Sequence, residues 1–225
     1  MRFALVVVML ASGCFTMPER HSTDRAGDAR GDGTGDDGGG SDAGGTTGLH
    51  ANIIFVTAAT FRIPGASTAM YSGTATLGAA DNLCQQSAIN APQGSPVRGH
   101  YYMAWMSADP MNARDRIAAQ AARAWRRVDD LPIAATLSDL ATGVLMNPIV
   151  FDENGADVGV VNVMTGTTAT GGYDAGQDGG CSQGRIGTGH PHASDALWEE
   201  GDHVGCPDMS SHIYCVGYDV KDGSL

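Results

Sequence analysis

The placement of five cysteines constrains this chain more than any other feature. A basic residue, Arg2, the apolar run Phe3–Ala11 and a short stretch of small residues precede Cys14, which is the pattern of a secretory signal. Such a signal directs a chain to an oxidising compartment, where cysteines form disulfides. The other cysteines are even in number, so all of them can pair. They are Cys84, Cys181, Cys206 and Cys215.

Four cysteines allow three pairings, and their predicted surroundings favour a nested one. Cys84 falls on the inner face of a predicted helix and Cys215 on the last predicted strand, whereas Cys181 and Cys206 bracket a glycine-rich loop. Bridges Cys84–Cys215 and Cys181–Cys206 would contribute about 5 and about 3.5 kcal/mol in the chain-entropy model, as upper limits. The alternative is a metal site, although none of the four shows the C-x₂-C spacing of zinc motifs.

The segment that ends at Cys14 resembles the lipobox of bacterial lipoproteins, with Ala11 where leucine is commoner. The resemblance implies that residues 1–13 are a cleaved signal peptide and that Cys14 carries the lipid, whose three acyl chains anchor the protein permanently. Phe15 rather than aspartate follows, which in Gram-negative lipoproteins implies transport to the outer membrane. The alternative is an ordinary signal peptide with an incidental cysteine. Nine apolar residues are too few for a transmembrane helix, which needs about 20.

Residues 14–48 predict a disordered tether, because they contain ten glycines and six aspartates and almost nothing that could be buried. Its typical reach is roughly 30 to 35 Å. Two other interpretations are an adhesion tripeptide at 30–32 and a calcium loop in the Asp/Gly run. The calcium loop is disfavoured because Asp37 stands where an EF-hand has glycine, and Ala43 where it has glutamate.

The net charge of −12 disfavours a nucleic-acid-binding protein, whose affinity depends on Lys and Arg. Residues 49–225 predict one α+β domain with one sizeable core. Predicted strands cover residues 52–57, 101–106, 125–128, 146–151, 158–164 and 212–218. Predicted helical segments cover residues 78–88, 112–122 and 137–140. Thr165–Leu197 has nine glycines in 33 residues and predicts a long functional loop, extending to Cys206.

The order of motifs along the domain resembles a family of bacterial lipoproteins of unknown function, which in turn is similar to endostatin. The resemblance implies the C-type-lectin-like (endostatin-like) fold over about residues 52–220, with mostly antiparallel sheets, two short helices and a long disulfide-held loop. Its most specific parts are Cys84 and Cys215. The other matching runs are residues 53–57, 78–83, 102–107, 113–117, 148–155, 163–167 and 214, with Cys181 and Cys206.

The chain also departs from this family and from its fold relatives. The family often has tryptophan at Met164 and soon after the loop cysteine, where Gln183-Gly184 stands. The zinc-binding histidines of endostatin have no counterpart, and its heparin-binding arginine surface contrasts with 18 acidic and nine basic residues in 50–225. The sugar-binding triplets of calcium-dependent lectins are absent from the sequence.

The disulfide-held loop is the predicted binding surface. Its candidate ligand-contacting residues are Thr165, Thr167, Tyr173, Asp174, Asp178 and Arg185. His190, His192 and His203 are weak candidates for a metal site, and the alternative is solvated loop histidines. A basic cluster could bind anionic glycan or lipid headgroups, or could be an ordinary ion-paired face. It consists of Arg114, Arg116, Arg123, Arg126 and Arg127.

These patterns predict a lipid-anchored cell-envelope protein without catalysis or cofactor, binding a glycan or an extracellular protein. Ser210-Ser211-His212 and Glu199-Glu200 are the nearest approaches to a catalytic set, and they rest on proximity in sequence alone. The alternatives are a structural envelope lipoprotein without a soluble ligand and a metal-dependent hydrolase.

Overall fold

The last strand, β9 (Ser210–Gly217), is the centre of the fold in the computed structural model. The structure describes residues 51–63, 73–173, 175, 184–206 and 210–225, which all belong to one unit, Thr46–Leu225. Four strands pair with β9, so that its residues from Ile213 onward are buried. Three of them are antiparallel and the fourth parallel: β1 (Asn52–Val56), β2 (Phe61–Arg62), β3 (Tyr102–Ala104) and, in parallel, β6 (Val163–Met164).

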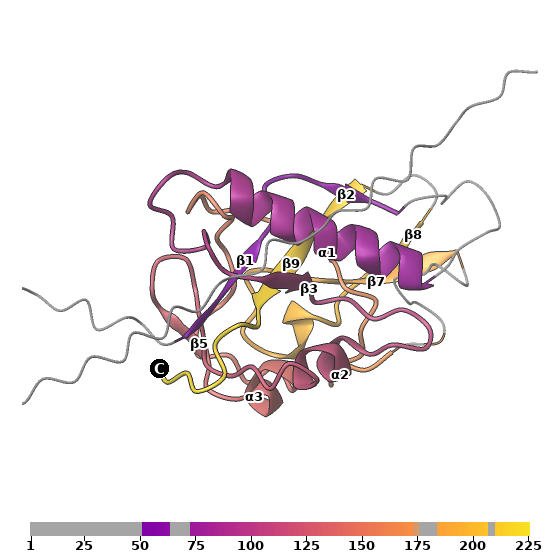
Figure 1. Cartoon of the computed structure of the whole chain (residues 1–225). Helices are drawn as coiled ribbons and strands as arrows, with labels where there is room; N and C mark the ends of the chain where they lie inside the picture. Colours follow the sequence, from indigo (N-terminus) through magenta and orange to yellow (C-terminus); the bar gives the residue numbers. More distant parts are fainter. Residues whose placement is uncertain (1–50, 64–72, 174, 176–183, 207–209) are drawn as a thin grey trace, which may run out of the picture. The chain divides into compact units, whose positions relative to one another are not determined.

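The remaining strands extend this sheet on both sides (Figure 1). β4 (Trp125–Arg126) pairs in parallel with β1, and β5 (Pro132–Ala134) pairs with β4. On the other side, β7 (Arg185–Gly189) pairs with β6, and β8 (His203–Gly205) pairs with β7. Within the described residues, six of the eight strand pairings are antiparallel, and the fold is therefore α+β with a mostly antiparallel sheet.

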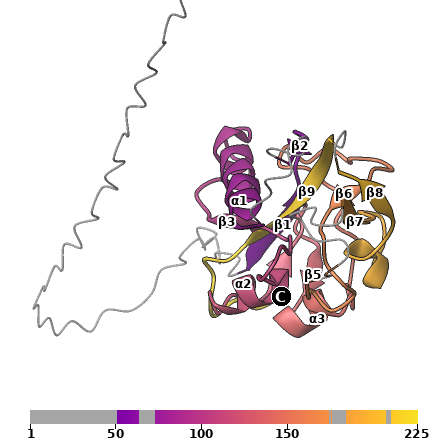
Figure 2. The same ribbon diagram turned by 90° about the vertical axis from the view of Figure 1, so that its right-hand side faces the viewer.

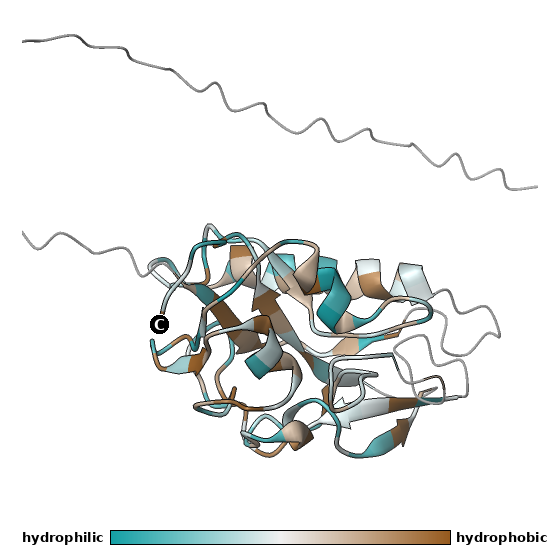
Figure 3. Cartoon of the chain, turned by 90° about the horizontal axis from the view of Figure 1, so that it is seen from below, coloured by the Kyte–Doolittle hydropathy of each residue, from teal (hydrophilic) through white to brown (hydrophobic). Residues whose placement is uncertain are grey.

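The helices cover the two faces of the central strands. α1 (Gly73–Asn90) lies on one side, and α2 (Ala113–Ala118) and α3 (Leu137–Ala141) lie on the other (Figures 1 and 2). One hydrophobic cluster contains the inner face of α1 with Phe55, and a second contains residues of α2 and α3 with the three tryptophans. Hydrophobic residues are concentrated on the central strands, whereas hydrophobic and hydrophilic residues alternate along α1 (Figure 3). β1 and β9 are thus buried on both faces.

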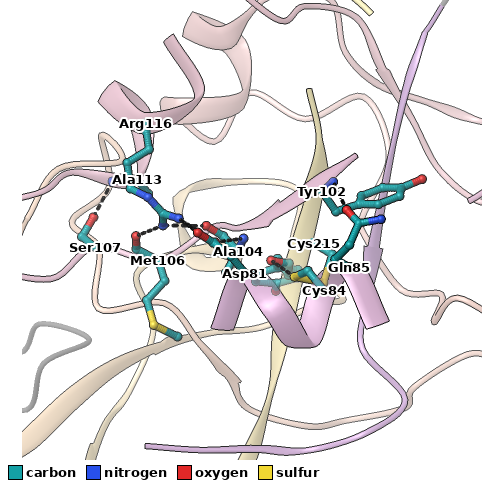
Figure 4. Close-up of polar contacts among 11 residues, drawn as sticks. Asp81, Cys84, Gln85, Tyr102, Ala104, Met106, Ser107, Ala113, Arg116 and Cys215 are labelled. Carbon is teal, nitrogen blue, oxygen red and sulfur yellow. Dashed lines mark hydrogen bonds and ion pairs between the residues drawn. A yellow bond between two sulfur atoms is a disulfide. The ribbon is translucent and has the colours of Figure 1, made fainter. Parts of the chain in front are cut away.

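A disulfide and an ion pair fasten α1 to this framework (Figure 4). Cys84 is bonded to Cys215, with Cα atoms 5.3 Å apart and 131 positions between them in sequence. This is the long bridge of the nested pairing predicted above. Asp81, also on α1, accepts hydrogen bonds of 2.5 and 2.6 Å from Arg116 of α2. Arg116 also donates to the carbonyl oxygens of Ala104 and Met106 at 3.1 and 3.0 Å.

Parts of the other predicted features lie outside the described residues. Cys206 is buried and disulfide-bonded, but its predicted partner, Cys181, is not among them. The same holds for the signal peptide, Cys14 and the tether 14–48. Among the described helices, none has the length and apolar character that a membrane span requires.

The predictions for the first strand, the helix that carries Cys84 and the last strand are confirmed by β1, α1 and β9. The predicted helical segments 112–122 and 137–140 correspond to the short helices α2 and α3. The resemblance implied two short helices alone, and the 18-residue α1 comes in addition to them among the described residues. The predicted strand 146–151 forms only one isolated bridge, from its last residue, Phe151, to Asp157. In 158–164 only β6 is a strand, because Gly159 adopts a left-handed φ of +70° and Val160 is 98% exposed.

Candidate functional site

The first half of the predicted binding loop is fastened to the turn that follows η1, a short 3₁₀ helix (Ala196–Trp198). The hydroxyls of Thr165 and Thr167 donate to the carbonyl oxygen of Glu199 at 2.6 and 3.0 Å. Both threonines are buried, so the prediction that they contact a ligand is corrected: they hold the loop in place. The backbone N–H of Ala169 donates to the carboxylate of Glu200.

The second half of this loop is not a loop throughout. β7 lies within Thr165–Leu197 and begins at Arg185, and η1 begins within this range and ends at Trp198. Arg185 is exposed and donates to the carbonyl oxygen of His203 at 3.1 Å. Tyr173 is half-buried, and its backbone N–H donates to Oδ1 of Asn112 at 2.6 Å. Asp174 and Asp178, the two acidic candidates, lie outside the described residues.

A pocket of about 230 Å³ lies where this loop meets the start of α2. Its lining combines a cation, a carboxylate, an amide and a hydroxyl with two glycines. The lining residues are Asn112, Arg114, Asp115, Thr170, Gly171 and Gly172. Two hydrogen bonds join the two walls. The backbone N–H of Arg114 donates to the carbonyl oxygen of Gly171 at 3.1 Å, and the backbone N–H of Tyr173 donates to the side chain of Asn112. Polar groups of this kind can donate and accept hydrogen bonds to a small polar ligand.

Gly171 shapes the pocket because no other residue fits its position. Its φ is +68°, and a Cβ there would lie 2.9 Å from Cβ of Arg114 and 3.0 Å from Cζ2 of Trp105. Both the left-handed conformation and the close approach require glycine. The indole of Trp105 therefore lies directly behind the pocket.

A buried carboxyl group accepts a hydrogen bond from Trp105. Glu199 is fully buried, and its Oε2 accepts a hydrogen bond of 2.8 Å from Nε1 of Trp105. Trp105 packs against Trp198 with ring centroids 5.2 Å apart, and Trp198 packs against Tyr214 at 5.1 Å. Burial raises the pKa of Glu199 to about 9; the Trp105 hydrogen bond acts against this rise, and the charge of Glu200 adds to it. Glu199 is therefore a neutral acid at pH 7.

The sequence singled out Glu199-Glu200 only for their proximity, and it did not predict this structural role. No local pattern marks Glu199 as buried, because its partner Trp105 is 94 residues away. The adjacent pair Gly171-Gly172 was the one visible signal of a close backbone approach at the pocket.

The candidate metal ligands do not converge. Nε2 of His190 lies 3.8 Å from Asp202, and Nε2 of His192 lies 3.3 Å from Asp157, while His203 is exposed on β8. Among the described residues, no group of three or more His, Cys, Asp or Glu side chains could hold a metal ion.

The serine and histidine of the weak catalytic candidate also bond elsewhere. Nδ1 of His212 is 2.6 Å from the carbonyl oxygen of Thr57, and the hydroxyl of Ser211 donates to the carbonyl oxygen of Asn162. These contacts hold β9 to its neighbouring segments.

The predicted basic cluster is largely neutralised by ion pairs. Arg116 pairs with Asp81. In the same way, Nη2 of Arg127 lies 2.6 Å from Asp129 and Nη1 of Arg126 lies 3.1 Å from Asp130. Nε of Arg114 lies 4.0 Å from Oδ1 of Asp115, and of the five arginines only Arg123 has no ion pair among the described residues.

Comparison with known proteins gives no assignment: no protein-family model matches the chain, and no curated protein matches it significantly.

Proposed function

We propose that this protein is a lipid-anchored envelope protein whose domain, 49–225, recognises a glycan without catalysis. In this proposal, Cys14 carries the lipid, the tether 14–48 holds the domain near the outer membrane, and the domain has the C-type-lectin-like fold. The mostly antiparallel sheet and the disulfide between α1 and the last strand support that fold assignment.

The pocket between α2 and Thr170–Gly172 is the observation that carries the functional part of the proposal. It combines hydrogen-bonding side chains with a backbone that approaches closely, and these features suit a ligand rich in hydroxyl groups. The hydrogen bonds from Arg114 to Gly171 and from Tyr173 to Asn112 hold the two walls together. A preorganised site loses less free energy to ordering when the ligand binds.

A glycan array probed with the full chain tests this proposal. Thr170 is exposed at the rim, so Thr170→Phe should fill the pocket without disturbing the core. We expect the wild-type protein to bind one set of glycans and Thr170→Phe to lose them. Val160→Phe is the matched control, because Val160 is 98% exposed and does not line the pocket. Equal binding by both variants and the wild type would place recognition elsewhere and refute the proposal.

The structural-lipoprotein alternative makes a different prediction. It expects no glycan on the array but a stable protein partner that co-purifies with the full chain. A metal-dependent hydrolase would instead contain stoichiometric metal after purification, which elemental analysis detects.

A further inference from the structure

The pocket carries one positive and one negative side chain that lie side by side in a long, exposed ion pair. Nε of Arg114 is 4.0 Å from Oδ1 of Asp115, and their side chains are 54% and 62% exposed. Within the described part of the chain, the guanidinium of Arg114 has no nearer carboxylate. Oδ2 of Asp115 accepts a hydrogen bond of 2.5 Å from Asn112, which fixes the carboxylate at the pocket. The formal charge of the lining is therefore zero.

The surroundings do not add positive charge to this pocket. Arg116, the next arginine on α2, is turned toward Asp81 and is only 12% exposed. The ion pairs of Arg126 and Arg127 likewise remove those two arginines as free cations. Residues 50–225 contain 18 acidic and nine basic side chains, so the field of the whole domain opposes the approach of an anion.

We infer that the pocket binds one electrically neutral, hydroxyl-bearing sugar unit, with Asp115 accepting and Arg114 donating hydrogen bonds to its hydroxyls. This inference rests on the proposed function and names its ligand class. Charged donors and acceptors form stronger hydrogen bonds with neutral partners than uncharged groups do, and a neutral ligand avoids repulsion from either charge.

The size of the pocket agrees with a single sugar unit. The pocket has a volume of about 230 Å³. It lies below the pockets of about 300 Å³ or more that hold drug-sized ligands.

The test compares neutral sugars with their acidic counterparts on the full chain. Glucose, galactose and mannose are titrated alongside glucuronic, galacturonic and mannuronic acids, with saturation-transfer NMR as the readout. We expect at least one neutral hexose to bind at least about 10-fold more tightly than its acid. Asp115→Asn and Arg114→Gln should each weaken that binding by about 10-fold or more, the usual effect of losing a charged hydrogen bond.

Arg123→Gln is the matched control, because Arg123 is exposed, does not line the pocket and has no ion pair among the described residues. Its sugar binding should equal that of the wild type. Tighter binding of uronic acids, lost in Arg114→Gln, would overturn the inference and leave glycan recognition standing. Neutral binding that survives both pocket substitutions would also overturn it. Failure of every sugar, neutral or acidic, would overturn the inference together with the proposed function.

Discussion

Glu199→Gln should be more stable than the wild type, and the difference should grow with pH, because the wild type loses stability as the pH rises. Burial raises the pKa of Glu199 from an ordinary value of 4.5 to about 9 in the folded state. Between these two values the folded protein keeps a proton that the unfolded chain has lost, so the free energy of unfolding falls as the pH rises. Each pH unit costs at most about 1.36 kcal/mol. Over the three units from pH 5 to pH 8, the loss is up to about 4 kcal/mol.

Glutamine at this position keeps an oxygen that can accept the Trp105 hydrogen bond, now 2.8 Å, but it cannot ionise. We therefore expect the two proteins to be about equally stable at pH 5 and Glu199→Gln to be more stable by up to about 4 kcal/mol at pH 8. Urea unfolding at pH 5, 6.5 and 8, followed by the fluorescence of the three buried tryptophans, measures this difference. Asp222→Asn, which removes an exposed carboxylate, should show no such trend. A stability difference that stays constant with pH would refute a neutral buried Glu199.

Two further predictions concern the framework that holds the site. Replacing Cys84 and Cys215 together by alanine opens a loop of 131 positions, and urea unfolding should show a loss of up to about 5 kcal/mol; a loss below about 1 kcal/mol would show that this bridge contributes little. Arg116→Met removes four hydrogen bonds and leaves Asp81 without its cation, holding only the hydrogen bond from the backbone N–H of Ala104, so the same assay should show a loss of about 2–3 kcal/mol. Arg126→Met, whose partner Asp130 is exposed, should cost less than about 1 kcal/mol, and equal losses would contradict this view of the Asp81–Arg116 pair.

The sequence predicted those elements whose pattern is long and local. β1 is a run of buried apolar residues and Asn52, and α1 presents small and apolar side chains at helical spacing, so both could be located without tertiary information. The inward direction of Cys84 followed from the same spacing. Its burial and its bond to Cys215 agree with that prediction.

Several short strands and the site could not be located in this way. β2 has two residues and exists because β9 offers it a partner, and β7 and β8 fall where a loop was predicted. β4, in contrast, lies within the predicted strand 125–128. The apolar run that ends in β6 looked like a longer strand, but Gly159 turns the backbone and exposes Val160. The pocket joins Asn112 to Gly171 across 59 positions, a contact that no local pattern encodes.

The recognition site itself is tested most directly by backbone amide chemical shifts during titration with a neutral hexose. Binding at the pocket predicts that the largest shifts fall on residues 112–115 and 170–172 and that Thr170→Phe abolishes them. Shifts confined to another face, or shifts that persist in Thr170→Phe, would contradict the assignment of this pocket.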